Sequence, residues 1–288
     1  MLPFVLGLSS ALLGAGANLA ARSLMQRISP RDFIPVNFML MALMMLPGVP
    51  FFWHFEGGWL TVAILGGTVL LDTLGNFLYF RAFEINNAAT ASALLSLSPL
   101  FTLLLSGLVA FTPSPGWMDA LAVLLIVAGT VVLQREMAAA DAAADPARGT
   151  RFMRLLAPLG AALIFGATIL PIKYLLGNRL LNPYTFYFLR APLIALLAQL
   201  FFRPDYRWLT RSTLPLTAGR AVIVLAQWLL LLYALQGGKP ATVKAVSDAS
   251  PLFVLLAGSL FLHEKITRRK AAGVLGVVIG LALLAAGG

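Results

Sequence analysis

The sequence alternates between long apolar runs and short polar connections. A helix needs about 20 apolar residues to cross about 30 Å of hydrocarbon. Backbone groups in lipid must pair within a segment, and the runs lack the alternation of lipid-facing strands. We therefore predict an all-α polytopic membrane protein with ten transmembrane helices, at 3–25, 34–53, 59–82, 88–111, 117–134, 153–176, 183–202, 213–235, 241–262 and 270–286.

The first apolar run has the hydropathy of a signal peptide but not its flanks. No Lys or Arg precedes it, and Asn18 interrupts it before Arg22. A secretory signal carries its cations ahead of the apolar region. We interpret residues 3–25 as a retained first helix.

One long polar connection, residues 135–152, divides the chain into halves at 1–134 and 153–288. Each half holds five predicted helices. Because five is odd, two similar halves must insert with opposite orientation. The count predicts two inverted five-helix repeats about an axis in the membrane plane.

An internal repeat supports this division. Residues 80–101 return as 232–253, shifted by 152, with eight of 22 aligned pairs identical and Ser-Pro-Leu-Phe in both copies. Each copy places a proline, Pro99 or Pro251, inside an apolar run. Interrupted helices at matching positions of two halves are typical of transporters.

The basic residues are distributed unevenly between the two sets of loops. The odd-numbered connections hold 13 cations, whereas the even-numbered ones hold only Arg179 and Lys239. Because cytoplasmic loops are enriched in Lys and Arg, we predict that the odd loops are cytoplasmic and that both termini lie outside.

Composition excludes several classes of protein. The chain has 288 residues, of which 60% are hydrophobic and 11% charged, and its net charge is +10. The cations lie in short loops, where they act as topology signals, so nucleic-acid binding is not expected. Cysteine is absent and the two histidines, His54 and His263, lie in different predicted loops. We expect no metal site, no cofactor and no catalytic residues, because no nucleophile–base pair or nucleotide-binding motif is present.

Charged residues inside the predicted helices are the main candidates for a site, because charges at membrane depth face a cavity or a partner. Asp72, Asn76 and Tyr79 are spaced to share one helical face. We expect Asp72 to face a wet cavity, where it accepts a proton or binds a substrate ammonium. Packing of the stripe against another helix is the alternative.

Lys244 and Asp248 are four residues apart on the ninth helix, just before Pro251. They form either an internal ion pair that only neutralises both charges, or a pair that exchanges partners as the helix bends. Proline leaves a carbonyl unpaired and weakens a helix locally, so Pro99 and Pro251 are candidate hinges. Ser92 and Ser96 occupy the matching positions in the fourth helix.

The remaining candidates for the cavity wall are polar or aromatic side chains within predicted helices. Arg22 and Arg81 lie near helix ends and are expected to reach the interface instead. Arg190 and Arg220 lie deeper, and structural pairing and function remain open for both. The full set of candidate cavity or substrate-binding residues adds Asn18, Lys173, Tyr187, Arg190, Arg220, Gln227 and Trp228 to those above.

Ser250-Pro251-Leu252-Phe253, then Gly258, His263-Glu264-Lys265 and Gly273 to Gly280, resemble the closing segment of EamA-type domains of the drug/metabolite transporter superfamily. The first half departs from that pattern, with Thr112-Pro113 at the position of the acidic–basic pair and Asn37 where the second half has Arg190. Within the superfamily the chain looks most similar to YddG-type exporters of aromatic and neutral amino acids. The resemblance implies a central cavity and alternating access, and it implies cytosolic termini, in conflict with the loop charges.

These features predict a carrier in the inner or plasma membrane whose partners are the lipid bilayer and a small-molecule substrate. Six cations and two carboxylates lie within predicted helices, and this excess favours a substrate with a carboxylate or phosphate. We expect export of zwitterionic metabolites, foremost aromatic and neutral amino acids. A carrier of phosphorylated metabolites, a broad drug exporter, and a membrane-embedded enzyme are successively weaker alternatives. Gly276 and Gly280 permit close helix packing, which favours a monomer and leaves a homodimer open.

Overall fold

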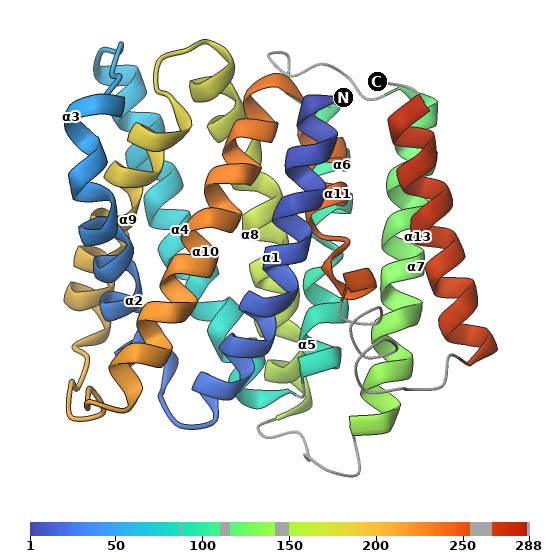
Figure 1. Ribbon diagram of the computed structural model, residues 1–288, viewed down its shortest axis with the longest axis horizontal. Coiled ribbons are helices and arrows are strands. Elements are labelled where there is room, and N and C mark those ends of the chain that lie inside the picture. Colours follow the sequence, from blue (N-terminus) through green and yellow to red (C-terminus); the bar gives the residue numbers. More distant parts are fainter. Residues whose placement is uncertain (87, 110–115, 142–149, 254–266, 287–288) are drawn as a thin grey trace.

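The computed structural model describes residues 1–86, 88–109, 116–141, 150–253 and 267–286, and this part of the chain is helical throughout apart from its connections (Figure 1). The helices follow the predicted runs closely. They are α1 (Leu2–Met25), α2 (Pro30–Met45), the 3₁₀ turn η1 (Leu46–Gly48), α3 (Val49–Phe52), α4 (Trp59–Ile85), α5 (Ala88–Leu95), α6 (Ser98–Ser106), α7 (Trp117–Asp141), α8 (Arg151–Gly177), α9 (Pro183–Phe202), α10 (Thr213–Gly237), α11 (Pro240–Ser247) and α13 (Arg268–Ala286).

The helices present apolar side chains outward and small or polar ones inward. Within the described residues, six helical segments are long and apolar enough to span a bilayer: α1, α2 through α3, α4, α8, α9 and α10. Large apolar side chains such as Leu70, Leu196 and Val222 are exposed on their outer faces. Such a surface is stable in lipid and not in water. The predicted all-α membrane fold is confirmed; residues 254–262 of the predicted ninth helix lie outside the described part.

The two halves run in opposite directions. In Figure 1, α1 descends from the N-terminus at the top, whereas α8 ascends from the lower face. The first helix of each half packs against the third helix of the other, α1 on α10 and α8 on α4. Helix α1 begins and α13 ends at the upper face, whereas the connections between α1 and α2 and between α9 and α10, both of which carry cations, lie at the lower face. This arrangement is the inverted repeat predicted from the helix count.

Two helices are broken at matching positions of the two halves. The break between α5 and α6 falls at Ser96–Leu97, and helix α11 ends before Asp248–Ala249, shifted by 152. Pro99 is the second residue of α6, and Pro251 the second residue of the helical segment that resumes at Ser250. A helix does not use the N–H groups of its first turn, so proline is tolerated there and initiates a new helix.

Helix α13 packs tightly against α7 within the chain. A Cβ atom added to Gly129 would lie 2.5 Å from the carbonyl oxygen of Gly273, and one added to Gly280 would lie 2.7 Å from that of Ala122. Glycine at these positions lets the two backbones touch. The glycines of α13 therefore pack against α7 of the same chain.

Candidate functional site

A cavity of about 110 Å³ lies between the two halves, where both broken helices meet the interior. Its wall comes from α1, α2, α4, α5, α6, α8, α10 and α11. Of the side chains predicted from the sequence, those that line it are Asn18, Asn76, Tyr79, Ser92, Ser96, Arg220, Gln227, Trp228, Lys244 and Asp248. Predicted residues from five different helices are thus brought together at one place.

Lys244 and Asp248 form an ion pair on the cavity wall. The Lys244 Nζ atom lies 2.7 Å from Oδ1 and 2.6 Å from Oδ2 of Asp248. Asp248 directly follows the last residue of α11 and caps that helix, and its side chain is 22% exposed. Since a helix C-terminus favours a cation and the resuming helix favours an anion, the break itself stabilises this arrangement.

Arg220 is the cavity cation whose hydrogen-bond partner is an amide and not a carboxylate. Its Nη1 donates to Oδ1 of Asn37 at 3.0 Å, while its Nε finds no acceptor in the described part of the chain. Phe33 and Phe80 lie against the guanidinium, with ring centroids 5.5 and 4.8 Å from Cζ. Both rings stabilise the charge without neutralising it.

Asn37 was not among the predicted site residues. It lies on α2, is fully buried, lines the cavity and leaves its Nδ2 without an acceptor in the described structure. The sequence contains one indication of its role. Asn37 lies 153 residues before Arg190, and the same offset relates Pro30 to Pro183. The aromatic wall formed by Phe38, Phe80 and Phe165 had no such signal, because apolar residues are common throughout the chain.

Two further polar groups are held in place within the cavity. The Tyr79 hydroxyl donates to Oδ1 of Asn18 at 2.7 Å, which joins α4 to α1. The Asn76 side chain donates to the backbone oxygen of Asp72 at 2.7 Å, one turn earlier in the same helix. The Asn76 carbonyl oxygen remains as an acceptor for a bound molecule, whereas the Tyr79 hydroxyl also lies against the Arg220 guanidinium.

Asp72 does not face the cavity, which corrects the expectation from helical spacing. Its Oδ2 lies 2.6 Å from Nε of Arg190, its Oδ1 accepts from Thr168 at 3.1 Å, and both ionic side chains are fully buried. A carboxylate at membrane depth needs a counter-ion and hydrogen bonds, and α9 and α8 supply them on the side away from the cavity.

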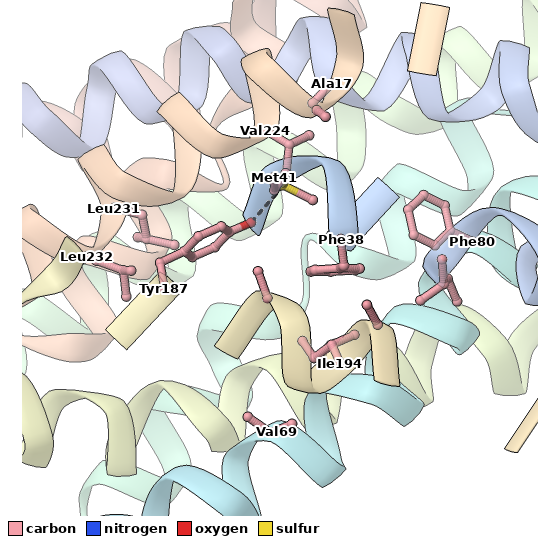
Figure 2. Close-up of a cluster of buried hydrophobic side chains, with 14 of the residues drawn as sticks. Ala17, Phe38, Met41, Val69, Phe80, Tyr187, Ile194, Val224, Leu231 and Leu232 are labelled. Atoms are coloured by element: carbon pink, nitrogen blue, oxygen red, sulfur yellow. Dashed lines mark hydrogen bonds between the residues drawn. The ribbon is translucent and has the colours of Figure 1, made fainter. Parts of the chain in front are cut away.

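Arg190, Lys173 and Tyr187 also lie outside the cavity lining. Arg190 is held by Asp72, and its Cζ lies 4.4 Å from the ring centroid of Trp228 and 5.4 Å from that of Tyr187. The Tyr187 hydroxyl points to the sulfur of Met41, at 3.1 Å (Figure 2). Lys173 donates to the carbonyl oxygens of Leu235 and Gln236 at the end of α10.

The pairing of the in-helix cations decides the charge of the cavity. Arg22 binds backbone oxygens, Arg81 pairs with Glu84, and Arg190 and Lys244 pair with the two deep carboxylates. Among the described residues, two cations and one carboxylate remain on the cavity wall. The excess of four positive charges inferred from the sequence is therefore reduced to one, carried by Arg220.

The sequence matches the model of the EamA-like transporter family over residues 1–135 and again over residues 152–286. The chain belongs to the EamA-like transporter family. This EamA-like protein is a multi-pass membrane transporter of small molecules. The family assignment, which the sequence motifs had suggested, is confirmed, whereas the narrower likeness to YddG-type exporters is not part of that match.

Among the solved structures that are similar to this EamA-like chain is a protein crystal structure with a TM-score of 0.72 and 17% sequence identity. The match covers 98% of this chain and 95% of the other. At this identity the likeness establishes a shared fold and no more. No curated protein matches the sequence.

Proposed function

We propose that this transporter exports small zwitterionic metabolites, foremost aromatic and neutral amino acids as the YddG-type exporters do, and that the cavity is the substrate site. The observation that supports this best is Arg220, a buried guanidinium with an unpaired Nε and no carboxylate partner in the described structure. A buried charge without a counter-ion is costly. A substrate carboxylate would supply that counter-ion during transport, in the forked geometry that arginine favours.

The ammonium group of a zwitterionic substrate would bind the carboxylate of Asp248. A substrate ammonium would share this carboxylate with Lys244 or replace Lys244 in the pair. Both exchanges keep the cavity close to neutral, because the zwitterion adds no net charge. The side-chain oxygen of Asn76 offers a further acceptor to an ammonium group.

The remaining wall favours an apolar substrate side chain of modest size. Phe38, Phe165, Trp228 and Leu231 line the cavity. Its volume of about 110 Å³ is small beside the roughly 300–1,000 Å³ of sites for drug-sized ligands. A broad exporter of bulky drugs is therefore the weaker alternative.

A carrier of phosphorylated metabolites is also less favoured. A phosphate monoester carries close to two negative charges at neutral pH. The cavity offers one unneutralised cation, because Lys244 is occupied by Asp248. Binding such a substrate would require Lys244 to leave its carboxylate, which would then be buried without a partner.

Alternating access would use the broken helices as gates, with the breaks before Pro99 and Pro251 as hinges. Each break interrupts the backbone ladder at the cavity, so the half-helices on either side can tilt separately. In the inverted arrangement α11 approaches the upper face of Figure 1, whereas α5 starts at the lower face. One half-helix would thus open towards each side of the membrane in turn.

The test is a substrate screen in proteoliposomes. We expect facilitated movement of labelled neutral amino acids and no movement of sugar phosphates, with a pH gradient applied afterwards to separate proton exchange from facilitated diffusion. Facilitated movement of phosphorylated metabolites alone would overturn the proposal. Empty liposomes and liposomes with an Arg220→Gln variant serve as controls.

A further inference from the structure

The indole of Trp228 lies against a second guanidinium. It lines the cavity, and the Cζ atom of Arg190 lies 4.4 Å over its ring centroid, while Arg190 itself is fully buried and does not line the cavity. Phe38, which also lines the cavity, lies 5.7 Å from the same Cζ atom. Arg190 is therefore one aromatic ring away from the space in which a substrate would bind.

Arg190 retains unused hydrogen-bonding capacity. Its Nε is bound to Asp72, but Nη1 and Nη2 are buried and have no acceptor in the described part of the chain. The neighbouring groups are the rings of Trp228, Phe38 and Tyr187, and the Tyr187 hydroxyl is directed to Met41 (Figure 2). Aromatic faces stabilise the guanidinium, although they do not replace an oxygen acceptor.

We propose that Trp228 is a specificity-determining residue: by covering Arg190 it limits the substrate to a single carboxylate. With the indole in place the cavity presents one unneutralised cation, Arg220. Without it, the two free nitrogens of Arg190 form a second anion subsite that binds the distal carboxylate of a dicarboxylate. The inference deepens the proposed function, on which it rests for the role of Arg220.

The size of the effect follows from the groups involved. A carboxylate that accepts from two guanidinium nitrogens forms charge-assisted hydrogen bonds. We expect Trp228→Ala to bind succinate about 10- to 100-fold more tightly than the unmodified protein, the range of one such charged interaction. Alanine, which has no second carboxylate, should gain nothing from Arg190, so the quantity compared between variants is the ratio of succinate affinity to alanine affinity.

The experiment measures succinate binding to the purified, detergent-solubilised protein through its thermal stabilisation. Trp228→Phe keeps a ring over Arg190 and should show no gain in succinate affinity relative to alanine affinity. Phe165→Ala is the matched control, because it enlarges the same cavity by one aromatic ring but uncovers no cation. Adding Arg190→Met and Asp72→Leu to Trp228→Ala removes the buried pair as a unit and should abolish the gain.

Equal succinate affinity of Trp228→Ala and Phe165→Ala would overturn the inference, as would a gain that survives the loss of Arg190. Both results come from binding measurements and do not require the protein to transport amino acids. Failure of the proposed function would appear separately, as a lack of alanine binding to the unmodified protein. If Trp228→Ala does not fold, Trp228→Leu offers a second variant that removes the ring and keeps apolar volume.

Discussion

Lys173 makes in the second half the contact that Arg22 makes in the first. Arg22 Nη1 donates to the carbonyl oxygens of Phe83 and Glu84 at the end of α4. Lys173 Nζ donates to those of Leu235 and Gln236 at the end of α10, at 2.9 and 3.0 Å. The cations are 151 residues apart and the acceptors 152. Each first helix thus caps the third helix of its own half, immediately before a half-helix begins.

These caps make a prediction about stability. A helix C-terminus leaves carbonyl oxygens unpaired and carries partial negative charge, so a bound cation stabilises it. Lys173→Met should lower the free energy of unfolding by about 1 kcal/mol, as for a typical hydrogen bond to a charged group at a helix end. Lys173→Arg should restore it. Unfolding in detergent measures this, and an unchanged Lys173→Met protein would show that the contact contributes nothing.

Asn37 allows the charge of Arg220 to be tested without removing it. Asn37→Asp places a carboxylate 3.0 Å from Nη1 and gives Arg220 an internal counter-ion. We expect the variant to be at least as stable as the unmodified protein and to lose transport at least about tenfold, because the substrate carboxylate must compete with the introduced one. Asn37→Ala, which removes the contact and adds no charge, should retain more transport. Full activity of Asn37→Asp would contradict the role of Arg220.

Asp72 and Arg190 are predicted to act as one structural unit. Removing one partner leaves a buried charge, so Asp72→Leu and Arg190→Met should each destabilise the protein by about 3–5 kcal/mol. The double change Asp72→Leu with Arg190→Met removes both charges and should cost far less. A double-mutant cycle of unfolding free energies measures the coupling. Additive effects of the two changes would mean that the pair is not coupled.

Orientation in the membrane is a separate prediction. The odd-numbered connections hold most of the loop cations, and those between α1 and α2 and between α9 and α10 lie at the lower face, opposite the start of α1 and the end of α13. The positive-inside rule then places the termini outside the cytoplasm. A reporter that is active only in the cytoplasm should give no signal when fused to the C-terminus. Cytoplasmic activity would reverse the orientation while leaving the fold unchanged.

The internal repeat of the sequence indicated where the two helices at the site are broken. Helical spacing did not indicate which charged side chains pair with each other. An offset of 152 residues relates Ser96 to Asp248 and Pro99 to Pro251, and the structure breaks both helices at these positions. Such an offset is a property of the chain alone. Whether proline bends a helix or starts a new one depends on the backbone before it, which the sequence does not specify.

Asp72 shows why the charge of the cavity could not be read from the sequence. Helical spacing placed Asp72, Asn76 and Tyr79 on one face, and two of the three do line the cavity. That face is wide enough to meet two neighbours, because α4 packs against both α8 and α9. Asp72 turns to Arg190, 118 residues away, and no local pattern indicates this pairing.

The central claim is that a substrate carboxylate neutralises Arg220. The most direct measurement is counterflow of a labelled neutral amino acid in proteoliposomes, comparing the unmodified protein with Arg220→Gln and with Arg81→Gln, a cation paired with Glu84 outside the cavity lining. We predict full counterflow for Arg81→Gln and a loss of at least about tenfold for Arg220→Gln. Equal counterflow by all three proteins would contradict the account.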